Sequence, residues 1–288
     1  MTRLIVVDAT PYGPEPSGAR RRAEALMPRL ARRLPDDVLE VHWAADGGGP
    51  GEGVDADNLV HVEVGLSCRG GAGRWRRVRR HLQRRHRAAA FTHLLTDHGP
   101  LVRPDAIANV VTLHDLRFLH GWSGPLRAAY GRWVYPGRLA RAQAVVAVSP
   151  SVLEEARHRF PGIALELAPN AVSQPFAEGR SAGPRTGALV VARDEPRKAR
   201  GAAVEASRQA GLDLTVVDGG LTDRELATAY RRAAWLIAPS LEEGFDLPVV
   251  EALALGTPVV ASDIPAHRDL VELGARGLVL VPPPSVQG

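Results

Sequence analysis

The chain has 288 residues, of which 45% are hydrophobic and 24% charged, and its formal net charge is +4. This length suits two domains of moderate size, and this balance excludes a disordered or collagen-like chain. The only cysteine, Cys68, cannot form an intramolecular disulfide.

The N-terminal segment RLIVVDA (3–9) is a short apolar run that Asp8 interrupts. It predicts a first β-strand and not a signal peptide. No apolar run approaches the ~18 residues that a membrane span needs. We therefore expect a cytoplasmic protein.

Strand-like and helix-like stretches alternate through the first half. Pro136 is expected to kink or divide the third helix. The predicted strand segments are 3–9, 38–44, 58–64, 91–99, 108–116, 144–150 and 163–170, and the predicted helices are 17–34, 73–90, 124–142 and 151–160. This alternation predicts a doubly wound α/β domain over residues 1–170.

A Gly- and Pro-rich connector (171–187) then leads into a second alternating region. Its predicted strands are 188–193, 212–220, 233–240, 257–263 and 276–284, with helices at 199–211 and 222–233. Thr222 and Glu225 form a capping-box pattern. A short helix between the third and fourth of these strands has Asp246 as its expected N-cap and Gly256 at its end. This region therefore predicts a second, shorter doubly wound domain over residues 171–288, and we expect a ligand cleft between the two domains.

The stretch EEGFDLPVVEALALGTPVVASD (242–263) places Glu243 and Glu251 eight residues apart. On one helix these carboxylates would point about 80° apart, which does not suit a shared site. With Glu243 in a loop after a strand and Glu251 in the next helix, a single ligand could contact both. Carboxylates accept hydrogen bonds from pairs of hydroxyls, as sugar or ribose recognition requires.

Lys198 is the only lysine among 36 basic residues, and it follows Arg193 at the carboxyl end of a predicted strand. Two fixed cations at this place can stabilise a diphosphate leaving group without a metal. In the first domain His114 likewise follows a strand. The triplet Asp55-Ala56-Asp57 lies in a Gly-rich loop, and the His and Cys residues lack metal-ligand spacing, so we expect no essential metal and no cofactor.

Several motifs together, in order from residue 108 to 265, resemble the group 1 (family 4) retaining glycosyltransferases, mannosyltransferase-like branch. They are VVTLHDLRFL, AVVAVSPSVLEEARHRF, LAPNAVSQPF, VVARDEPRKARG and PSLEEGFDLPVVEALALGTPVVASD. The resemblance implies the GT-B architecture of two Rossmann-like domains, here with a truncated second domain. It also implies transfer of a sugar, mannose-like in preference, from a nucleoside diphosphate-sugar to a hydroxyl.

The resemblance also implies roles for individual residues. Arg193 and Lys198 would hold the diphosphate, Glu251 the ribose and Glu243 the donor sugar, with His114 contacting that sugar from the other domain. The backbone of Gly244, Phe245 and Asp246 would face the sugar and phosphates. Gly18 stands where the family carries a Gly-Gly loop, with Arg20 or Arg21 as candidate phosphate contacts.

The segment RGGAGRWRRVRRHLQRRHR (69–87) is rich in arginine, and Trp75, Val78 and Leu82 form a narrow apolar stripe along it. Three interpretations stay open: a basic helix on an anionic membrane surface near a lipid-linked acceptor, a solvated helix whose stripe docks on its own sheet, or a surface that binds nucleic acid or another anionic partner. We expect no nucleic-acid partner, because no aromatic readout motif accompanies the charge.

Two other functions compete with the transferase. One is a shortened, non-catalytic relative that binds nucleotide-sugars or partners an active subunit. The other is a basic protein that binds anionic surfaces. The short second domain is expected to leave apolar surface exposed, which a partner or a second copy of the chain could cover.

Overall fold

The computed structural model describes residues 2–15, 17–69, 73–97, 102, 107–120, 122, 124–179 and 183–285. It divides into two compact units. The N-terminal unit comprises residues 1–148 and 152–171, and the C-terminal unit comprises 149–151 and 172–288. Each unit is built on its own parallel sheet, as the alternating pattern predicts.

The N-terminal unit contains a seven-stranded sheet whose neighbouring strands pair in parallel. Its strands, in spatial order, are β3 (Leu59–Val64), β2 (Val38–Ala44), β1 (Leu4–Asp8), β4 (His93–Thr96), β5 (Ala108–Leu113), β6 (Ala144–Ala147) and β7 (Leu165–Leu167). The chain runs outward from β1 to β3 and then returns to β4 on the other side of β1. The carboxyl ends of β1 and β4 therefore lie side by side at the point where the strand order reverses.

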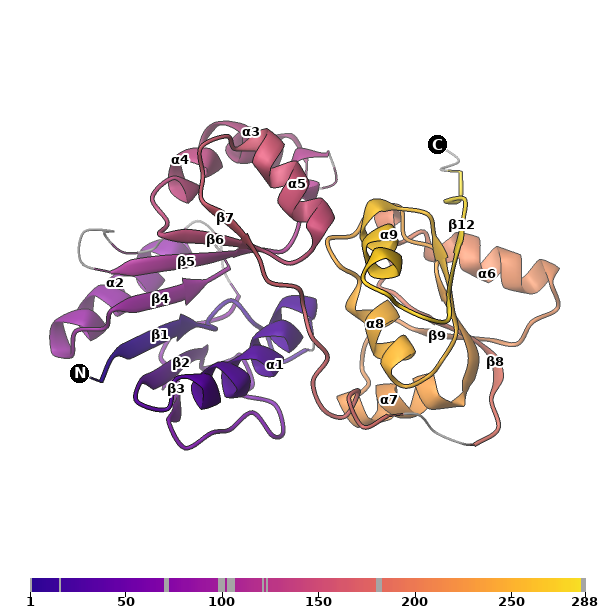
Figure 1. Cartoon of the computed structure of the whole chain (residues 1–288), viewed down its shortest axis with the longest axis horizontal. Coiled ribbons are helices and arrows are strands. Elements are labelled where there is room, and N and C mark those ends of the chain that lie inside the picture. The colour runs from indigo at the N-terminus through magenta and orange to yellow at the C-terminus, as the bar shows by residue number, and fades with distance from the viewer. Residues whose placement is uncertain are drawn as a thin grey trace. The chain divides into compact units, whose positions relative to one another are not determined.

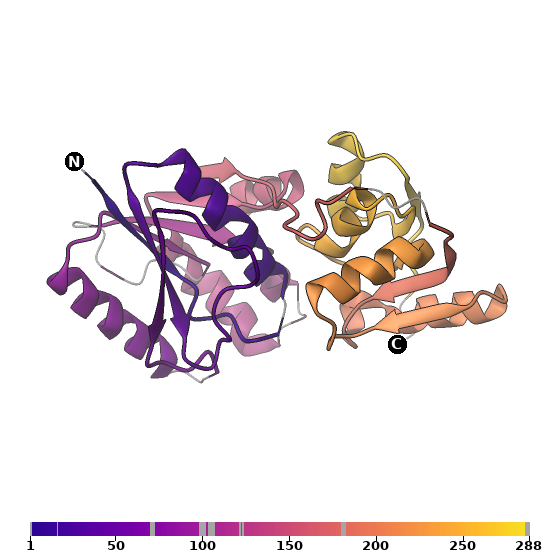
Figure 2. The same cartoon turned by 90° about the horizontal axis from the view of Figure 1, so that it is seen from below.

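Helices cover both faces of this sheet. They are α1 (Gly18–Arg33), α2 (Gly73–Ala88), η2 (Arg117–Leu119), α3 (Pro125–Trp133), α4 (Tyr135–Leu139) and α5 (Pro150–Arg159). The first of them covers one face and α2 the other (Figures 1 and 2). The predicted helix 124–142 is divided into α3 and α4 just before Pro136, because proline cannot continue the hydrogen-bond ladder.

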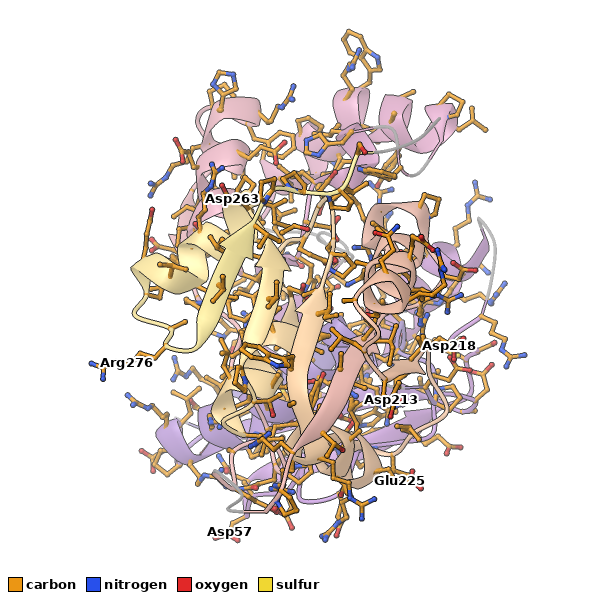
Figure 3. The ribbon with its side chains drawn as sticks, turned by 90° about the vertical axis from the view of Figure 1, so that its right-hand side faces the viewer. Asp57, Asp213, Asp218, Glu225, Asp263 and Arg276 are labelled. Carbon is orange, nitrogen blue, oxygen red and sulfur yellow. The ribbon has the colours of Figure 1, made fainter. Side chains whose placement is uncertain are left out.

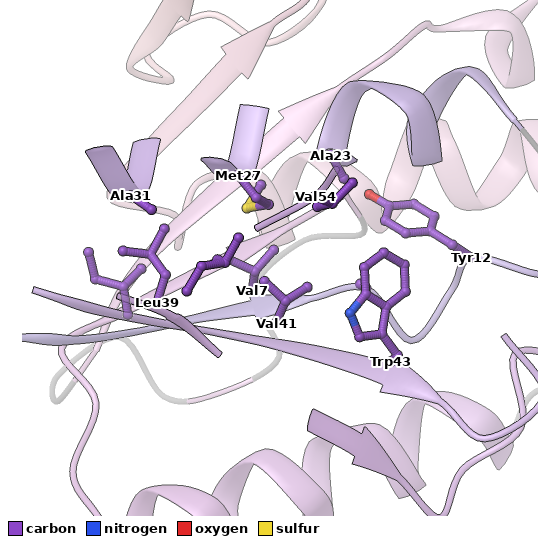
Figure 4. Close-up of a cluster of buried hydrophobic side chains, with 12 residues drawn as sticks. Val7, Tyr12, Ala23, Met27, Ala31, Leu39, Val41, Trp43 and Val54 are labelled. Carbon is purple, nitrogen blue, oxygen red and sulfur yellow. The ribbon is translucent and has the colours of Figure 1, made fainter. Parts of the chain in front are cut away.

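The main core of this unit lies between α1 and strands β1 to β3 (Figure 4). Alternate strand residues such as Val7, Val41 and Trp43 point to it, and Ala23 and Met27 of α1 cover them. This follows from the two-residue period of a strand and the apolar stripe of a helix.

Arg20 on α1 is buried and fixes the neighbouring loop. Its guanidinium donates to the carbonyl oxygens of Gly13 (2.5 Å), Gly47 (2.7 Å) and Gly49 (2.6 Å), and to Glu24 (2.9 Å). It also lies over the Trp43 ring, 5.4 Å from its centre. These hydrogen bonds engage four N–H donors of Arg20 inside the unit, and a phosphate contact by Arg20 or Arg21 stays a prediction.

The structure of α2 shows what the apolar stripe of the basic segment 69–87 contacts. Val78 and Leu82 are each 1% exposed, and they pack with Phe91 and Leu94 in the unit's own core. The apolar stripe therefore docks α2 on its sheet and is not free to insert into a membrane. The outer face keeps exposed arginines, namely Arg76, Arg77, Arg79, Arg80, Arg84 and Arg87.

The C-terminal unit has a five-stranded parallel sheet. Its strands, in spatial order, are β12 (Leu278–Val281), β11 (Val259–Ser262), β10 (Ala233–Ala238), β8 (Thr186–Val191) and β9 (Leu214–Val217). The helical segments are η3 (Pro196–Lys198), α6 (Arg200–Gln209), α7 (Asp223–Arg232), α8 (Leu247–Ala254) and α9 (Pro265–Glu272). The capping box predicted at Thr222 and Glu225 is present, whereas α9 is a helix that the sequence pattern did not predict.

One face of this sheet is only partly covered. Trp235 on β10 and Val279 on β12 are 46% and 53% exposed, and Val281 is 39% exposed. Asp213 and Asp218, beside the edge strand β9, and Arg276, before the opposite edge strand β12, mark the two sides of the sheet (Figure 3). The expected exposed apolar surface is therefore found on β10 and β12.

Candidate functional site

The C-terminal unit gathers charged side chains just beyond the carboxyl ends of β8 and β10. Lys198, in the turn η3 after β8, lies with its Nζ 2.5 Å from Oε1 of Glu243, in the loop after β10. Arg197 donates to the other carboxylate oxygen of Glu243 (3.1 Å) and to the Glu242 carbonyl oxygen (3.2 Å). Because the two strands are neighbours in a parallel sheet, residues far apart in sequence meet at one edge.

The Lys198 side chain is largely buried among acidic groups. Its ammonium also lies 4.0 Å from Oδ1 of Asp246. Burial lowers the pKa of Lys198, but the charges of Asp246 and Glu243 outweigh it and raise this pKa above its usual value. Lys198 is therefore a fixed positive charge at neutral pH, suited to an anionic ligand.

Asp246 precedes α8 with φ +65°, a conformation that is costly for a residue with a Cβ. Asp246 is the N-cap residue of α8, as predicted, although its side chain makes no cap hydrogen bond. One carboxylate oxygen instead accepts from Nε2 of His267 on α9 (2.9 Å). This long-range bond holds the turn.

His267 is fully buried, and each ring nitrogen faces an acceptor, the second being the Ser262 carbonyl oxygen at 2.7 Å. Both nitrogens can donate only in the imidazolium form. Burial lowers the pKa of His267, but the hydrogen bond to Asp246 and its charge raise this pKa above the usual value. Burial likewise raises the pKa of Asp246, and the charge of Lys198 together with the His267 bond brings it below its usual value.

Glu251 lies inside the unit. It is 1% exposed, and its Oε2 accepts a hydrogen bond from the Tyr230 hydroxyl at 3.1 Å. The alternative of a surface helix residue is therefore wrong for Glu251, and its role toward a ribose stays a prediction. The two glutamates have different surroundings: Glu243 is paired with cations, and Glu251 with a phenol.

The remaining predicted residues of this unit have different exposures. Arg193, just beyond β8, is exposed, and Gly244 is half-buried. The Phe245 side chain is buried. Arg197 is not among the residues that the sequence predicts. The signal that could have found it is its place beside Lys198 in a turn at the carboxyl edge of the sheet.

A second polar cluster lies in the N-terminal unit, at the carboxyl ends of β1, β4 and β5. Nε2 of His114, after β5, lies 3.1 Å from Oδ2 of Asp97, after β4. The Tyr12 hydroxyl donates a short hydrogen bond to the same carboxylate. Asp8, at the end of β1, is 1% exposed and accepts from the Thr10 backbone and hydroxyl. Its second oxygen has no hydrogen-bond partner among the described residues.

Three of these side chains, those of Asp8, Tyr12 and Asp97, border a small pocket. Its lining includes Asp8, Tyr12, Arg22 and Asp97. Burial raises the pKa of Asp8, and burial together with the Asp97 charge raises that of Tyr12 well above its usual value. The two carboxylates, the phenol and the guanidinium are groups that can hydrogen-bond to hydroxyls or pair with an anion. Of this cluster the sequence predicts only His114.

Gly18 is exposed at the first position of α1, after the cap Ser17, whose hydroxyl oxygen accepts from the Arg20 backbone (3.3 Å). Among the described residues, no group of three or more His, Cys, Asp or Glu side chains could hold a metal ion. Within those same ranges, no helix combines the length and hydrophobicity that crossing a membrane requires.

Comparisons with known proteins agree with this architecture. Residues 23–174 match the family model "Glycosyltransferase Family 4", and residues 174–288 match "Glycosyl transferases group 1". A 74-residue segment is 43% identical to the MMP alpha-(1->4)-mannosyltransferase of Mycolicibacterium hassiacum. It covers 26% of this chain and only 18% of that relative.

Solved structures share the whole fold at low sequence identity. Sucrose-phosphate synthase from Thermosynechococcus elongatus superposes with a TM-score of 0.79 at 16% identity, covering 98% of this chain and 86% of that one. Anabaena HepE, solved with UDP and glucose, gives 0.66 at 15% identity, covering 100% and 87%. With two parallel α/β units and two family models that together span residues 23–288, the chain belongs to the group 1 (family 4) glycosyltransferases and has the GT-B fold.

Proposed function

We propose that this chain transfers a sugar, mannose-like in preference, from a nucleoside diphosphate-sugar to an acceptor hydroxyl, with retention of configuration and without a metal. The observation that carries the proposal is the buried cluster of Lys198, Arg197 and Glu243 at the carboxyl edge of the C-terminal sheet. Similarity to a named mannosyltransferase supports the donor class, and the HepE structure with UDP and glucose supports a nucleotide-sugar.

The cluster contains cations for the diphosphate of such a donor and a carboxylate for its sugar. Negative charge grows on the diphosphate as its bond to the sugar breaks, and Lys198 and Arg197 would stabilise it in place of a metal. A bound diphosphate would compete with Glu243 for these two cations. The Glu243 carboxylate would then accept hydrogen bonds from sugar hydroxyls, and the backbone N–H groups of Gly244, Phe245 and Asp246 would add donors for phosphate oxygens.

In the transfer itself, the acceptor oxygen forms a bond to the anomeric carbon while the bond from that carbon to the phosphate oxygen breaks. The acceptor proton passes to the departing phosphate on the same face, so the configuration is retained and no protein nucleophile is required. Glu251, the partner of Tyr230, would bind the ribose.

The pocket of the N-terminal unit would hold the acceptor. Asp8 has an unused carboxylate oxygen there, and Asp97 carries His114 and Tyr12 as partners. Arg22 would bind a phosphate or carboxylate of the acceptor. The exposed arginines of α2 would attract the chain to an anionic surface that carries a lipid-linked acceptor, at about 1 kcal/mol per basic residue.

The first test is a thermal shift with UDP, GDP, dTDP and ADP, each with Mg²⁺ or with EDTA. At 100 times its dissociation constant, the right diphosphate should add about 2.7 kcal/mol of stability. We expect one nucleotide to stabilise the chain equally under both conditions. Lys198→Ala should lose the shift, and Arg276→Ala, an exposed cation of the same unit, should keep it.

Turnover is measured next, as nucleoside diphosphate released from the matching mannose or glucose donor. Binding without release for any acceptor would favour the non-catalytic relative. No shift with any nucleotide would refute the donor site.

A further inference from the structure

The edge strand β12 of the C-terminal unit has none of the features that usually protect the edge of a sheet. Within the described ranges it pairs with one strand, β11, and the register between the two has no bulge. The segment GLVLV (277–281) contains no charge and no proline, and Val279 and Val281 are 53% and 39% exposed. Native edge strands usually carry a charge, a proline or a bulge that prevents another strand from pairing with them. β12 is therefore open to a further strand.

The hydrogen bonds of β12 identify the backbone groups that face its open edge. The carbonyl oxygens of Gly277 and Val281 accept from backbone N–H groups on the β11 side, at 2.8 and 2.7 Å. Because successive residues of a strand direct their backbone groups to opposite sides, the N–H and C=O groups of Leu278 and Leu280 point away from β11. Both leucines therefore offer a donor and an acceptor to another strand.

A second copy of β12, running antiparallel, fits these groups about a two-fold axis at Val279. Leu278 would lie opposite Leu280 of the second copy, and Leu280 opposite its Leu278, so that each pair exchanges both N–H···O hydrogen bonds. Val279 would lie opposite Val279 of the second copy in the non-hydrogen-bonded pair between them, where side chains approach most closely. The pairing would thus cover an exposed valine of each chain with the same valine of the other.

The charges near the two ends of β12 also suit a second copy. Exposed Arg276 precedes the strand, and half-buried Asp263 lies at its other end, where its N–H donates to the Val281 carbonyl oxygen (2.7 Å; Figure 3). Antiparallel pairing brings the start of one strand to the end of the other. Each Arg276 would therefore approach Asp263 of the second copy, a carboxylate that already accepts from Arg268 (2.6 Å).

The opposite edge strand, β9, lacks this complementarity. It lies between exposed Asp213 and Asp218, so an antiparallel copy of it would bring carboxylates of the two chains together (Figure 3). We propose that two copies of this chain associate through β12, which joins their C-terminal sheets across a two-fold axis. Because both chains use the same patch, the association closes as a dimer. It is independent of the sugar transfer, since it needs neither donor nor acceptor.

The first test is sedimentation equilibrium over loading concentrations of about 1 to 100 µM. We expect a reversible monomer–dimer equilibrium for the wild type. Val279→Lys places like charges opposite each other at the two-fold axis and should raise the dissociation constant of the dimer about tenfold or more. Val216→Lys, the matched change of an exposed valine on β9, should leave this constant unchanged. Circular dichroism should show the same secondary structure in all three chains, because both valines are exposed.

A charge exchange tests the two ends of the pairing. Arg276→Glu and Asp263→Arg should each weaken the homodimer, because each substitution places like charges in contact twice. A mixture of the two variants should form a heterodimer that is tighter than either homodimer, because both contacts then join opposite charges. A mixture that associates no better than the single variants would refute the proposed register.

A disulfide tests the position of the axis. The Cα atoms of a non-hydrogen-bonded antiparallel pair lie about 4.5 Å apart, which is within the range that a disulfide spans. In a Cys68→Ser background, Val279→Cys should therefore form a disulfide between two chains with oxidised glutathione as the oxidant, whereas Val216→Cys should not. The proposal is refuted if the wild type stays monomeric throughout the concentration range, if Val279→Lys dimerises as the wild type does, or if both lysine variants lose the dimer equally.

Discussion

Replacing His267 by leucine would test how the turn before α8 is held. The substitution replaces the imidazole by an apolar side chain of similar size and removes both ring donors, one to Asp246 and one to the Ser262 carbonyl oxygen. Asp246 would keep Lys198 at 4.0 Å as a charged partner. Breaking one member of a buried charge pair costs about 3–5 kcal/mol, because the other charge stays buried. We expect a loss of about 3 kcal/mol in the C-terminal unit.

Native-state hydrogen exchange is the suitable assay because it reports opening of α8 and α9 separately from the N-terminal unit. Asp246→Asn and the double variant complete a cycle, in which the two substitutions should be strongly non-additive. A loss below about 1 kcal/mol for His267→Leu would refute the reasoning. The same loss in the Asp246→Asn background would refute it too, since the pair would then not be coupled.

Three further outcomes follow from the contacts described above. Because the pKa of His267 is higher in the folded than in the unfolded chain, its protonation stabilises the fold. This stabilisation is complete below about pH 6.5, the pKa of an unfolded histidine, and is lost as the pH rises through the folded pKa. Hydrogen exchange of α9 should show this loss of stability in the wild type but not in His267→Leu. Arg20→Met should lower the free energy of unfolding, measured by chemical denaturation, by about 3 kcal/mol or more, because three carbonyl oxygens and Glu24 lose their donor. Arg33→Met, at the exposed end of α1, should leave that free energy almost unchanged. Equal losses in the two variants would contradict this account. Tyr230→Phe removes the donor to the buried Glu251 and should cost about 2 kcal/mol, read from the melting temperature, and an unchanged melting temperature would show that Glu251 does not depend on that hydroxyl.

The strands and most helices could be predicted because their hydrophobic periods are local. Helix α9 could not, because its buried face includes His267 and Asp269 beside Ala266 and Leu270. Polar residues on that face hide the apolar stripe. Their burial is possible only with partners elsewhere in the chain, such as Asp246 for His267.

Part of the candidate site could also be predicted from the sequence. Lys198 and Glu243 can be picked out by residue type and by their place after strands, and the structure brings them together. The contribution of Arg197 and the burial of Glu251 depend on packing across strands and helices, which spacing alone does not reveal. Asp8 is the last residue of β1 and Asp97 follows β4 directly, as His114 follows β5, so the same signal was present for them.

The strand order of the C-terminal unit has a consequence for how the chain folds during synthesis. β8 lies between β9 and β10, and Thr186 pairs with Ala233, which is synthesised only after α6, β9 and α7. Until then β8 has one of its two neighbours, so the inner part of the sheet depends on non-local pairing, which is intrinsically slow. Lys198 and Glu243 lie on opposite sides of this interval, and their ion pair can form only once β10 is in place. Arg197 and Lys198 therefore have no ion pair with Glu243 until the chain has been synthesised beyond β10.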